Sequence, residues 1–159
     1  MKFERQEHLD LEWTDELVGF EVDEEWRGRS AAVRDEDGRS FPCQISSGDG
    51  PPKAWFRVDR LPPRGVRTYE LVEPEGNVES SFRVEQSGDC VELLSEHVGI
   101  RVPAAADEVA SFPSPIRAIR GQSGRWIGAG RISLSDFLEP ASVSSELVEE
   151  GPLFLRWRV

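Results

Sequence analysis

The sequence has no apolar run that approaches the roughly 20 residues required of a membrane-spanning helix. Its first residues, MKFERQEHLDLEW, also lack the apolar segment of a secretory signal, so we expect no signal peptide in this chain. The compartment stays open, because the chain can be cytoplasmic or can be exported after processing. Helical periodicity is scarce too, and only 104–110 and 134–140 are candidates for short helices.

Basic residues are fewer than acidic residues. The 159 residues include 19 lysines and arginines against 30 aspartates and glutamates, which gives a net charge of −11. Nucleic-acid binding requires a basic patch that displaces counterions from phosphates, so this balance argues against a nucleic-acid partner. Attraction to anionic membrane surfaces is disfavoured for the same reason. We therefore expect neither a nucleic-acid partner nor a membrane partner.

Cysteine and histidine are rare, with two residues of each. Cys43 and Cys90 have no cysteine or histidine at the short spacing of a zinc site, so we expect no metal and no cofactor. They either form a disulfide or are two buried free thiols, and free thiols are favoured without a secretory signal. His97 follows Glu96, where a solvated histidine is favoured over an acid–base pair. Since no G-x-S-x-G elbow is present either, we expect no catalytic residue.

Turn signals recur roughly every 8–12 residues, which is typical of sandwiches and barrels. The clearest are Asp37-Gly38, 87–89, 121–124 and 150–152, each between two short runs of alternating apolar and polar residues. Glycine beside aspartate supplies the positive φ that tight hairpin turns require. The pattern predicts an all-β fold of antiparallel β-sandwiches built from consecutive hairpins, with very little helix.

Alternation inside these runs predicts which side chains share a face of a sheet. In the run 54–59, Phe56 and Val58 fall on one face and the residues between them fall on the other. In the last run, Trp157 shares a face with Leu155, which favours a core position for this indole. Each run has an apolar face and a face that carries charged or hydroxyl groups, as a sheet with one solvated side requires.

A polar break, EPEGNVES, occupies residues 73–80. We therefore divide the chain into a small β-sandwich subdomain over 1–73, a linker over 74–80, and the start of a second β-sandwich over 81–159. The final run, LFLRWRV, ends without the polar residues with which most domains finish. This ending leads us to expect that the second sandwich is truncated and that further domains of a longer chain follow it.

Tryptophan is the residue type most suggestive of binding, because flat indole faces stack on sugar rings and leave the sugar hydroxyls free for polar partners. The five tryptophans are Trp13, Trp26, Trp55, Trp126 and Trp157. Trp55 shares a predicted strand face with Arg57 and Asp59, and Trp126 follows Arg125 in a glycine-rich hairpin. The candidate carbohydrate contacts are therefore Trp55, Arg57, Asp59, Arg125 and Trp126. The alternative is that both indoles fill the core between two sheets, and the two interpretations stay open.

The stretch AWFRVDRLPPRGVRTYELV, residues 54–72, joins two strand-like runs through Pro62 and Pro63. These prolines have no N–H donors and force an extended bend. Gly65 then frees the backbone to re-enter the sheet. We interpret the stretch as a corner between two strands of one sandwich, and therefore as scaffold.

Two blocks of sequence resemble a β-domain that recurs in large carbohydrate-active enzymes. Matching residues in the first block are Asp37, Gly38, Pro42, Gln44, Leu61, Pro62, Pro63, Gly65, Arg67, Thr68 and Tyr69. The second block comprises VELLSEHVGIRVP, FPSPIRAIRGQSGRWIGAG and VEEGPLFLRWRV. Similar segments occur in the β-sandwich portions of alpha-mannosidase-type glycosidases and of exo-acting rhamnogalacturonan lyase-like proteins.

The resemblance covers about 17–159 and matches no catalytic carboxylate and no metal-ligand motif of those enzymes. It implies a non-catalytic β-sandwich region of a polysaccharide lyase or glycoside hydrolase. Two alternatives remain. One is a free-standing carbohydrate-binding module with Trp55 and Trp126 as stacking platforms, and the other is a structural or oligomerisation β-domain that uses its unpaired edge strands.

Overall fold

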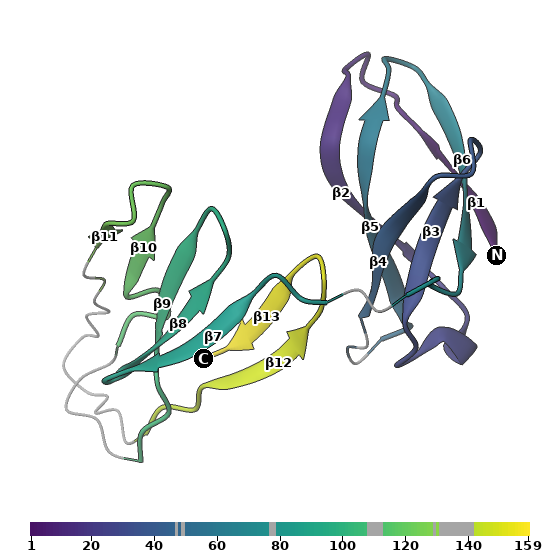
Figure 1. The fold of residues 1–159 in the computed structure, drawn as a ribbon. Coiled ribbons are helices and arrows are strands. Elements are labelled where there is room, and N and C mark those ends of the chain that lie inside the picture. Colours follow the sequence, from purple (N-terminus) through teal and green to yellow (C-terminus); the bar gives the residue numbers. More distant parts are fainter. Residues whose placement is uncertain (47, 49, 77–78, 108–112, 129, 131–141) are drawn as a thin grey trace. The chain divides into compact units, whose positions relative to one another are not determined.

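The fold is taken from a computed structural model, which describes residues 1–46, 48, 50–76, 79–107, 113–128, 130 and 142–159. Within these ranges all strand pairs are antiparallel and the helical content is one 3₁₀ turn, Glu24–Trp26, so the predicted all-β class is confirmed. The strands form two compact units (Figure 1). The first contains Met1–Glu79 with Gly151–Leu153, and the second contains Ser80–Glu150 with Phe154–Val159.

Neither helix candidate is observed as a helix in the described part of the chain. The candidate at 134–140 lies outside the described residues, as do residues 108–110 of the other. Residues 104–107 are described and are not helical. Ala106 instead forms an isolated antiparallel β-bridge with Val143. No helix in the described ranges is long and apolar enough to cross a membrane.

The first unit is one six-stranded sheet in the order β1-β6-β3-β4-β5-β2. Its strands are β1 (Lys2–Gln6), β2 (Trp13–Glu21), β3 (Ala31–Asp35), β4 (Ser40–Ser46), β5 (Lys53–Leu61) and β6 (Val66–Val72). The sheet is curled, so that β2 and β5 stand apart from β1 and β6 with β3 and β4 between them (Figure 1). This curl lets one face of a single sheet enclose the core, as the two layers of a sandwich do.

Aromatic rings fill the space inside the curl. Phe56 on β5 is fully buried and lies 4.7 Å from the Tyr69 ring on β6, measured between ring centroids. Phe3 on β1 and Phe20 on β2 stack at 3.6 Å, although these two strands are the opposite edges of the sheet. The Arg5 guanidinium also donates a hydrogen bond to the Gly19 carbonyl across the same seam. Side-chain contacts therefore join the edge strands β1 and β2, which have no backbone ladder between them.

The predicted hairpin turns are confirmed. Asp37-Gly38 joins β3 to β4 with Gly38 at φ 82°, and the Asp35 carboxylate accepts the Asp37 and Arg39 N–H groups at 3.0 and 2.8 Å. The turns at 87–89, 121–124 and 150–152 likewise connect paired antiparallel strands, described below. The side chains of β5 alternate as expected, since Phe56 and Val58 are buried and their neighbours are not.

The double proline is a corner between strands that are not neighbours in the sheet. Pro62–Gly65 leads from β5 to β6, and the Gly65 N–H donates to the Pro62 carbonyl at 2.8 Å. Arg64 adopts φ 56° at the third position, as a type II turn requires. Gly65 is needed for space, because an added Cβ would lie 2.8 Å from the Pro62 carbonyl oxygen. The positive φ thus falls on Arg64, one residue before the glycine that we expected to free the backbone.

A buried carboxylate ties this corner to the N-terminal loop. Glu7 is 1% exposed, and its Oε2 accepts the Arg64 N–H at 2.9 Å. Its Oε1 accepts the Leu9 N–H. Burial raises the pKa of Glu7, but N–H donors from Arg64, Leu9, Leu11 and Asp10 outweigh burial and bring the pKa below its ordinary value. Glu7 therefore stabilises the corner in its ionised form.

Replacing Glu7 by glutamine should make the stability of the first unit less dependent on pH. Because the pKa is lowered by folding, the stabilisation from Glu7 is complete above the unfolded-state pKa and is lost as pH falls through the folded-state value. Urea unfolding followed between about pH 2 and 7 should show a smaller acid loss in Glu7→Gln than in the wild type. Glu4, an exposed neighbour on β1, provides the control through Glu4→Gln. Equal acid losses in wild type and Glu7→Gln would contradict the assignment.

The second unit has a five-stranded sheet in the order β11-β10-β9-β8-β7 and a separate hairpin, β12-β13. The strands are β7 (Arg83–Ser87), β8 (Cys90–Leu94), β9 (Gly99–Pro103), β10 (Ala118–Arg120), β11 (Trp126–Ile127), β12 (Glu146–Glu150) and β13 (Leu155–Arg158). The hairpin is attached to the sheet through Ser145, whose hydroxyl accepts the Trp157 indole N–H at 2.8 Å and donates to the Pro103 carbonyl at 2.5 Å. Trp157 is half-buried on the apolar face of β13.

Both cysteines are buried free thiols, which confirms the interpretation favoured from sequence. Burial raises the pKa of the Cys43 thiol to about 12. Burial is also the largest cause of the raised pKa of Cys90, to which the neighbouring Asp89 carboxylate adds. Neither thiol is therefore activated as a nucleophile, because only the thiolate reacts readily.

Candidate carbohydrate-contact face

The structure places Trp55, Arg57 and Asp59 together on the outward side of β5, opposite the buried Phe56 and Val58. We call these three residues the β5 outward face. Trp55 is half-buried, whereas Arg57 and Asp59 are exposed. Period-two alternation was enough to bring them together, because successive side chains of a strand point to opposite sides of the sheet.

The Trp55 indole lies flat over the backbone of β2. Its partner in the β2–β5 ladder is Gly19, and a Cβ added to Gly19 would approach the six-membered ring of the indole to 2.8 Å. The indole N–H donates to the Ser46 hydroxyl on β4 at 2.9 Å. The ring is therefore held in one orientation by a glycine beneath it and by a hydrogen bond at its edge.

Ion pairs hold the two charged members of the face. The Arg57 guanidinium lies 2.9 Å from the Asp15 carboxylate on β2. Asp59 is bracketed by two arginines, since its two carboxylate oxygens each lie 3.1 Å from a guanidinium, one of Arg39 and one of Arg67. Exposed pairs such as these contribute little to stability, but they restrict where the charged heads can point.

Arg39 is itself anchored from the inside. Its guanidinium lies 2.9 Å from the Asp35 carboxylate, whose side chain is fully buried, and the pKa of Arg39 is raised chiefly by that hydrogen bond. The ion pairs thus form a continuous chain that starts at the buried Asp35 and runs through Arg39 and Asp59 to Arg67. Asp35, Arg39 and Arg67 were not predicted from the sequence, because Arg39 and Arg67 reach Asp59 from the β3–β4 hairpin and from β6, while Asp35 holds Arg39. No local pattern indicates that convergence.

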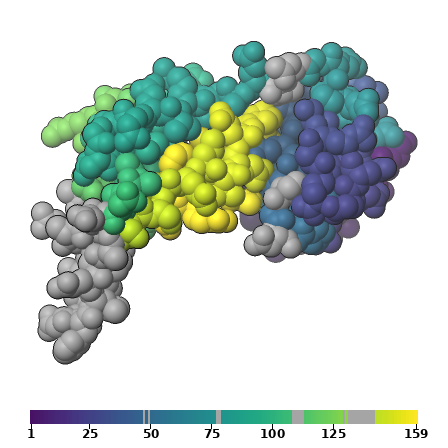
Figure 2. All heavy atoms as spheres, turned by 90° about the horizontal axis from the view of Figure 1, so that it is seen from below, coloured from purple at the N-terminus to yellow at the C-terminus, as the bar shows by residue number. Residues whose placement is uncertain are grey.

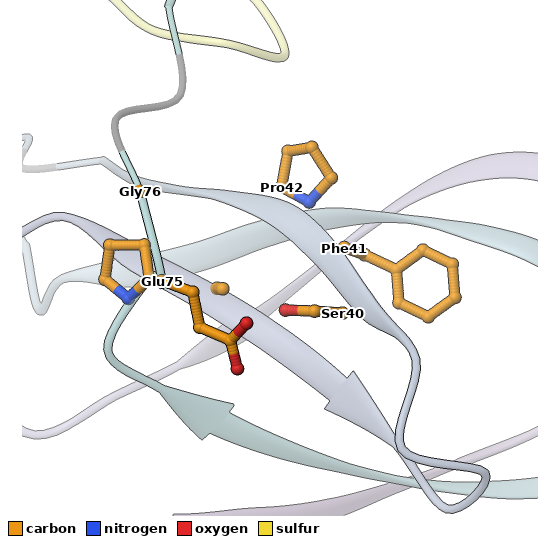
Figure 3. A pocket seen from close by; sticks show the side chains of 7 residues that line it. Ser40, Phe41, Pro42, Glu75 and Gly76 are labelled. Carbon is orange, nitrogen blue, oxygen red and sulfur yellow. The ribbon is translucent and has the colours of Figure 1, made fainter.

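An open pocket of about 250 Å³ lies elsewhere in the first unit, between β3, β4 and the segment after β6. Its lining residues are Ala32, Ser40, Phe41, Pro42, Pro74, Glu75 and Gly76. The Ser40 hydroxyl and the Glu75 carboxylate point toward one another across it, while the Phe41 ring points away (Figure 3). Glu75 also pairs with Arg34 at 3.2 Å. No residue of the β5 outward face lines this pocket, so it is a separate feature.

The other two sequence candidates, Arg125 and Trp126, belong to the second unit. Trp126 is packed among arginines: the Arg101 guanidinium carbon lies 4.3 Å from the ring centroid and that of Arg120 lies 5.3 Å away. Arg101 is fixed in turn by Glu92 at 2.7 Å. Such cation–π contacts occupy the aromatic surface that a sugar would need, which favours a packing role for Trp126.

The described residues contain no constellation typical of catalysis. His97 is exposed and lies 3.9 Å from the carboxylate of Glu96, which is also exposed, and His8 is exposed as well. No group of three or more histidine, cysteine, aspartate or glutamate side chains that could hold a metal ion occurs in the described ranges.

Comparison with known proteins adds no relative. No family model, no curated protein and no solved structure matches the chain.

Proposed function

We propose that the chain is a non-catalytic β-sandwich region that supports carbohydrate processing by a polysaccharide lyase or glycoside hydrolase, and that its β5 outward face contacts the sugar chain. The observation that carries the proposal is the fixed, half-buried Trp55 indole with Arg57 and Asp59 in line behind it. The resemblance of the sequence blocks to β-domains of carbohydrate-active enzymes supports the same function.

The spacing of the face suits an extended saccharide. Side chains two residues apart on a strand are separated by about 6.6 Å, so Trp55, Arg57 and Asp59 form a row about 13 Å long. An indole at one end buries the C–H surface of a sugar ring without taking its hydroxyls. The guanidinium of Arg57 donates hydrogen bonds and the carboxylate of Asp59 accepts them, so both can bond the hydroxyls of the next rings.

Replacing Trp55 by alanine should weaken binding to a polysaccharide that the wild-type chain binds. Affinity electrophoresis against a panel of soluble neutral and acidic polysaccharides identifies such a ligand, and titration calorimetry measures it. We expect Trp55→Ala to weaken binding by at least about tenfold, or about 1.4 kcal/mol. Trp55→Phe should keep part of the affinity, since a flat ring over Gly19 is retained while the bond to Ser46 is lost.

Val66→Ala is the matched control, because Val66 is 49% exposed on β6 and lies outside the face. It should bind as the wild type does. Circular dichroism and thermal unfolding show whether each variant is folded. If the folded wild-type chain binds no member of the panel, or if Trp55→Ala binds as tightly as Val66→Ala, the proposed sugar contact is wrong.

A further inference from the structure

The second unit has an apolar groove between its five-stranded sheet and its C-terminal hairpin. The groove has a volume of about 570 Å³, which is within the range of ligand-binding pockets. Its residues are Leu93, Ile100, Val102, Pro115, Ile116, Val148, Leu155, Arg156, Trp157, Arg158 and Val159. The hairpin that borders it forms a continuous surface, drawn in yellow in Figure 2.

One wall of the groove is the edge of a strand. Five consecutive residues, 155–159, line it, although the side chains of a strand alternate between two sides. Residues from both sides of β13 therefore line the groove, as they do along the edge of a strand. Among the described strands β13 pairs with β12 alone, so its second edge has no ladder partner in the part of the chain that the structure describes. Such an edge is a template for another extended chain.

The floor of the groove suits one face of an incoming strand. Leu93 on β8 and Ile100 on β9 are opposite one another in the ladder, and both are only partly buried. Ile116, just before β10, is 48% exposed. A strand laid along β13 would cover these side chains with every second residue and leave the residues between them beside the arginines of β13.

The charge of those intervening residues is indicated by β12, the strand that β13 already pairs with. Glu146 lies opposite Arg158 with an ion pair of 3.0 Å, and Glu149 lies opposite Arg156 with an ion pair of 3.5 Å. Leu147 lies opposite Trp157 between them. A strand on the second edge would meet the same two arginines, and opposite charges across a ladder stabilise pairing.

We infer that the groove is a β-strand acceptor site that binds an extended peptide segment of a partner protein, with apolar residues alternating with acidic ones. The segment adds a strand to β13, buries its apolar residues against β8 and β9, and places its carboxylates opposite Arg156 and Arg158. The backbone ladder supplies affinity and the alternation supplies selectivity. This interface is distinct from the β5 outward face and does not depend on sugar binding.

The test uses the full chain and a fluorescein-labelled octapeptide of alternating glutamate and leucine, followed by fluorescence anisotropy. A peptide with lysine in place of glutamate and one with the same residues grouped rather than alternating are the comparisons. The alternating acidic peptide should bind with an affinity at least about tenfold above both. Ile116→Glu should weaken its binding by about tenfold or more, because a charge then occupies the apolar floor.

Ile127→Glu is the matched control, since Ile127 is 68% exposed on β11 and does not line the groove. It should bind the peptide as the wild type does. Arg158→Glu should reduce the affinity for the acidic peptide by up to about fivefold and raise that for the lysine peptide. The inference is overturned if the acidic peptide does not bind, or if it binds no better than the lysine or grouped peptide. It is also overturned if sedimentation shows self-association that Ile116→Glu abolishes, because a second copy then fills the groove.

Discussion

Replacing Phe56 by alanine is expected to lower the free energy of unfolding by about 3–5 kcal/mol, the range for removing a buried phenylalanine ring. Phe56 has no solvent exposure, and its ring lies 4.7 Å from Tyr69, 5.7 Å from Phe3 and 6.2 Å from Phe20. These partners come from three other strands. Because the ring joins both sides of the curled sheet, its loss leaves a cavity that no single strand can fill by moving.

Urea unfolding of the full chain measures this effect, with Leu17→Ala as the control. Leu17 is 40% exposed and lies on β2, the strand paired with β5, so its replacement should change stability by about 0.5 kcal/mol or less. Phe56→Leu should fall between the two, since most of the buried volume is kept. A loss below about 1 kcal/mol for Phe56→Ala would contradict the position of Phe56 at the centre of the core.

Gly65→Ala is expected to destabilise the first unit by about 1–3 kcal/mol, the usual cost of forcing extra atoms into a packed site. The new Cβ would meet the Pro62 carbonyl oxygen and ring carbons at 2.8–2.9 Å. The oxygen also accepts the Gly65 N–H, so it cannot move away without breaking the turn. The clash is with backbone and with a rigid ring, and no flexible side chain is available to relieve it.

The neighbouring substitution, Arg64→Gly, should have the opposite sign. An L-residue at φ 56° costs roughly 1–2 kcal/mol, and glycine removes that cost while adding roughly 0.5–1 kcal/mol of unfolded-state entropy. We therefore expect a gain of up to about 1.5 kcal/mol, measured by the same urea titration. The exposed Arg64–Asp10 pair, at 3.3 Å, contributes little to this balance. If Gly65→Ala were neutral, the turn geometry assigned to Pro62–Gly65 would be wrong.

Local features of the sequence were sufficient for the strands and turns. Asp37-Gly38 and the three other turn signals predicted hairpins because glycine and aspartate adopt backbone angles that few other residues tolerate. Alternation in 54–59 placed Phe56 inside and Trp55 outside because the pleat has a period of two. These are properties of a few consecutive residues, and distant packing did not override them.

Only part of the candidate site could be predicted from local sequence patterns. The row formed by Trp55, Arg57 and Asp59 follows from alternation alone. Their partners do not, since Arg39 lies 20 residues from Asp59 in sequence and reaches it from another hairpin. The surroundings of Trp126 could not be predicted either. Arg101 and Arg120 pack on its ring, although the sequence alone made Trp126 as good a candidate for sugar stacking as Trp55. Whether an indole is a platform or a packing element depends on neighbours that only the fold supplies.

By itself, then, the amino-acid sequence determined the all-β class, the hairpins and the inward or outward direction of side chains along β5. The tertiary structure decided that β5 and β6 lie apart in one curled sheet, that Glu7 clamps the corner between them, and that β13 borders an apolar groove. The physical reason is the separation along the chain over which each effect acts. Turn chemistry and pleat act over two to four residues, whereas strand order and burial depend on which distant side chains exclude water together.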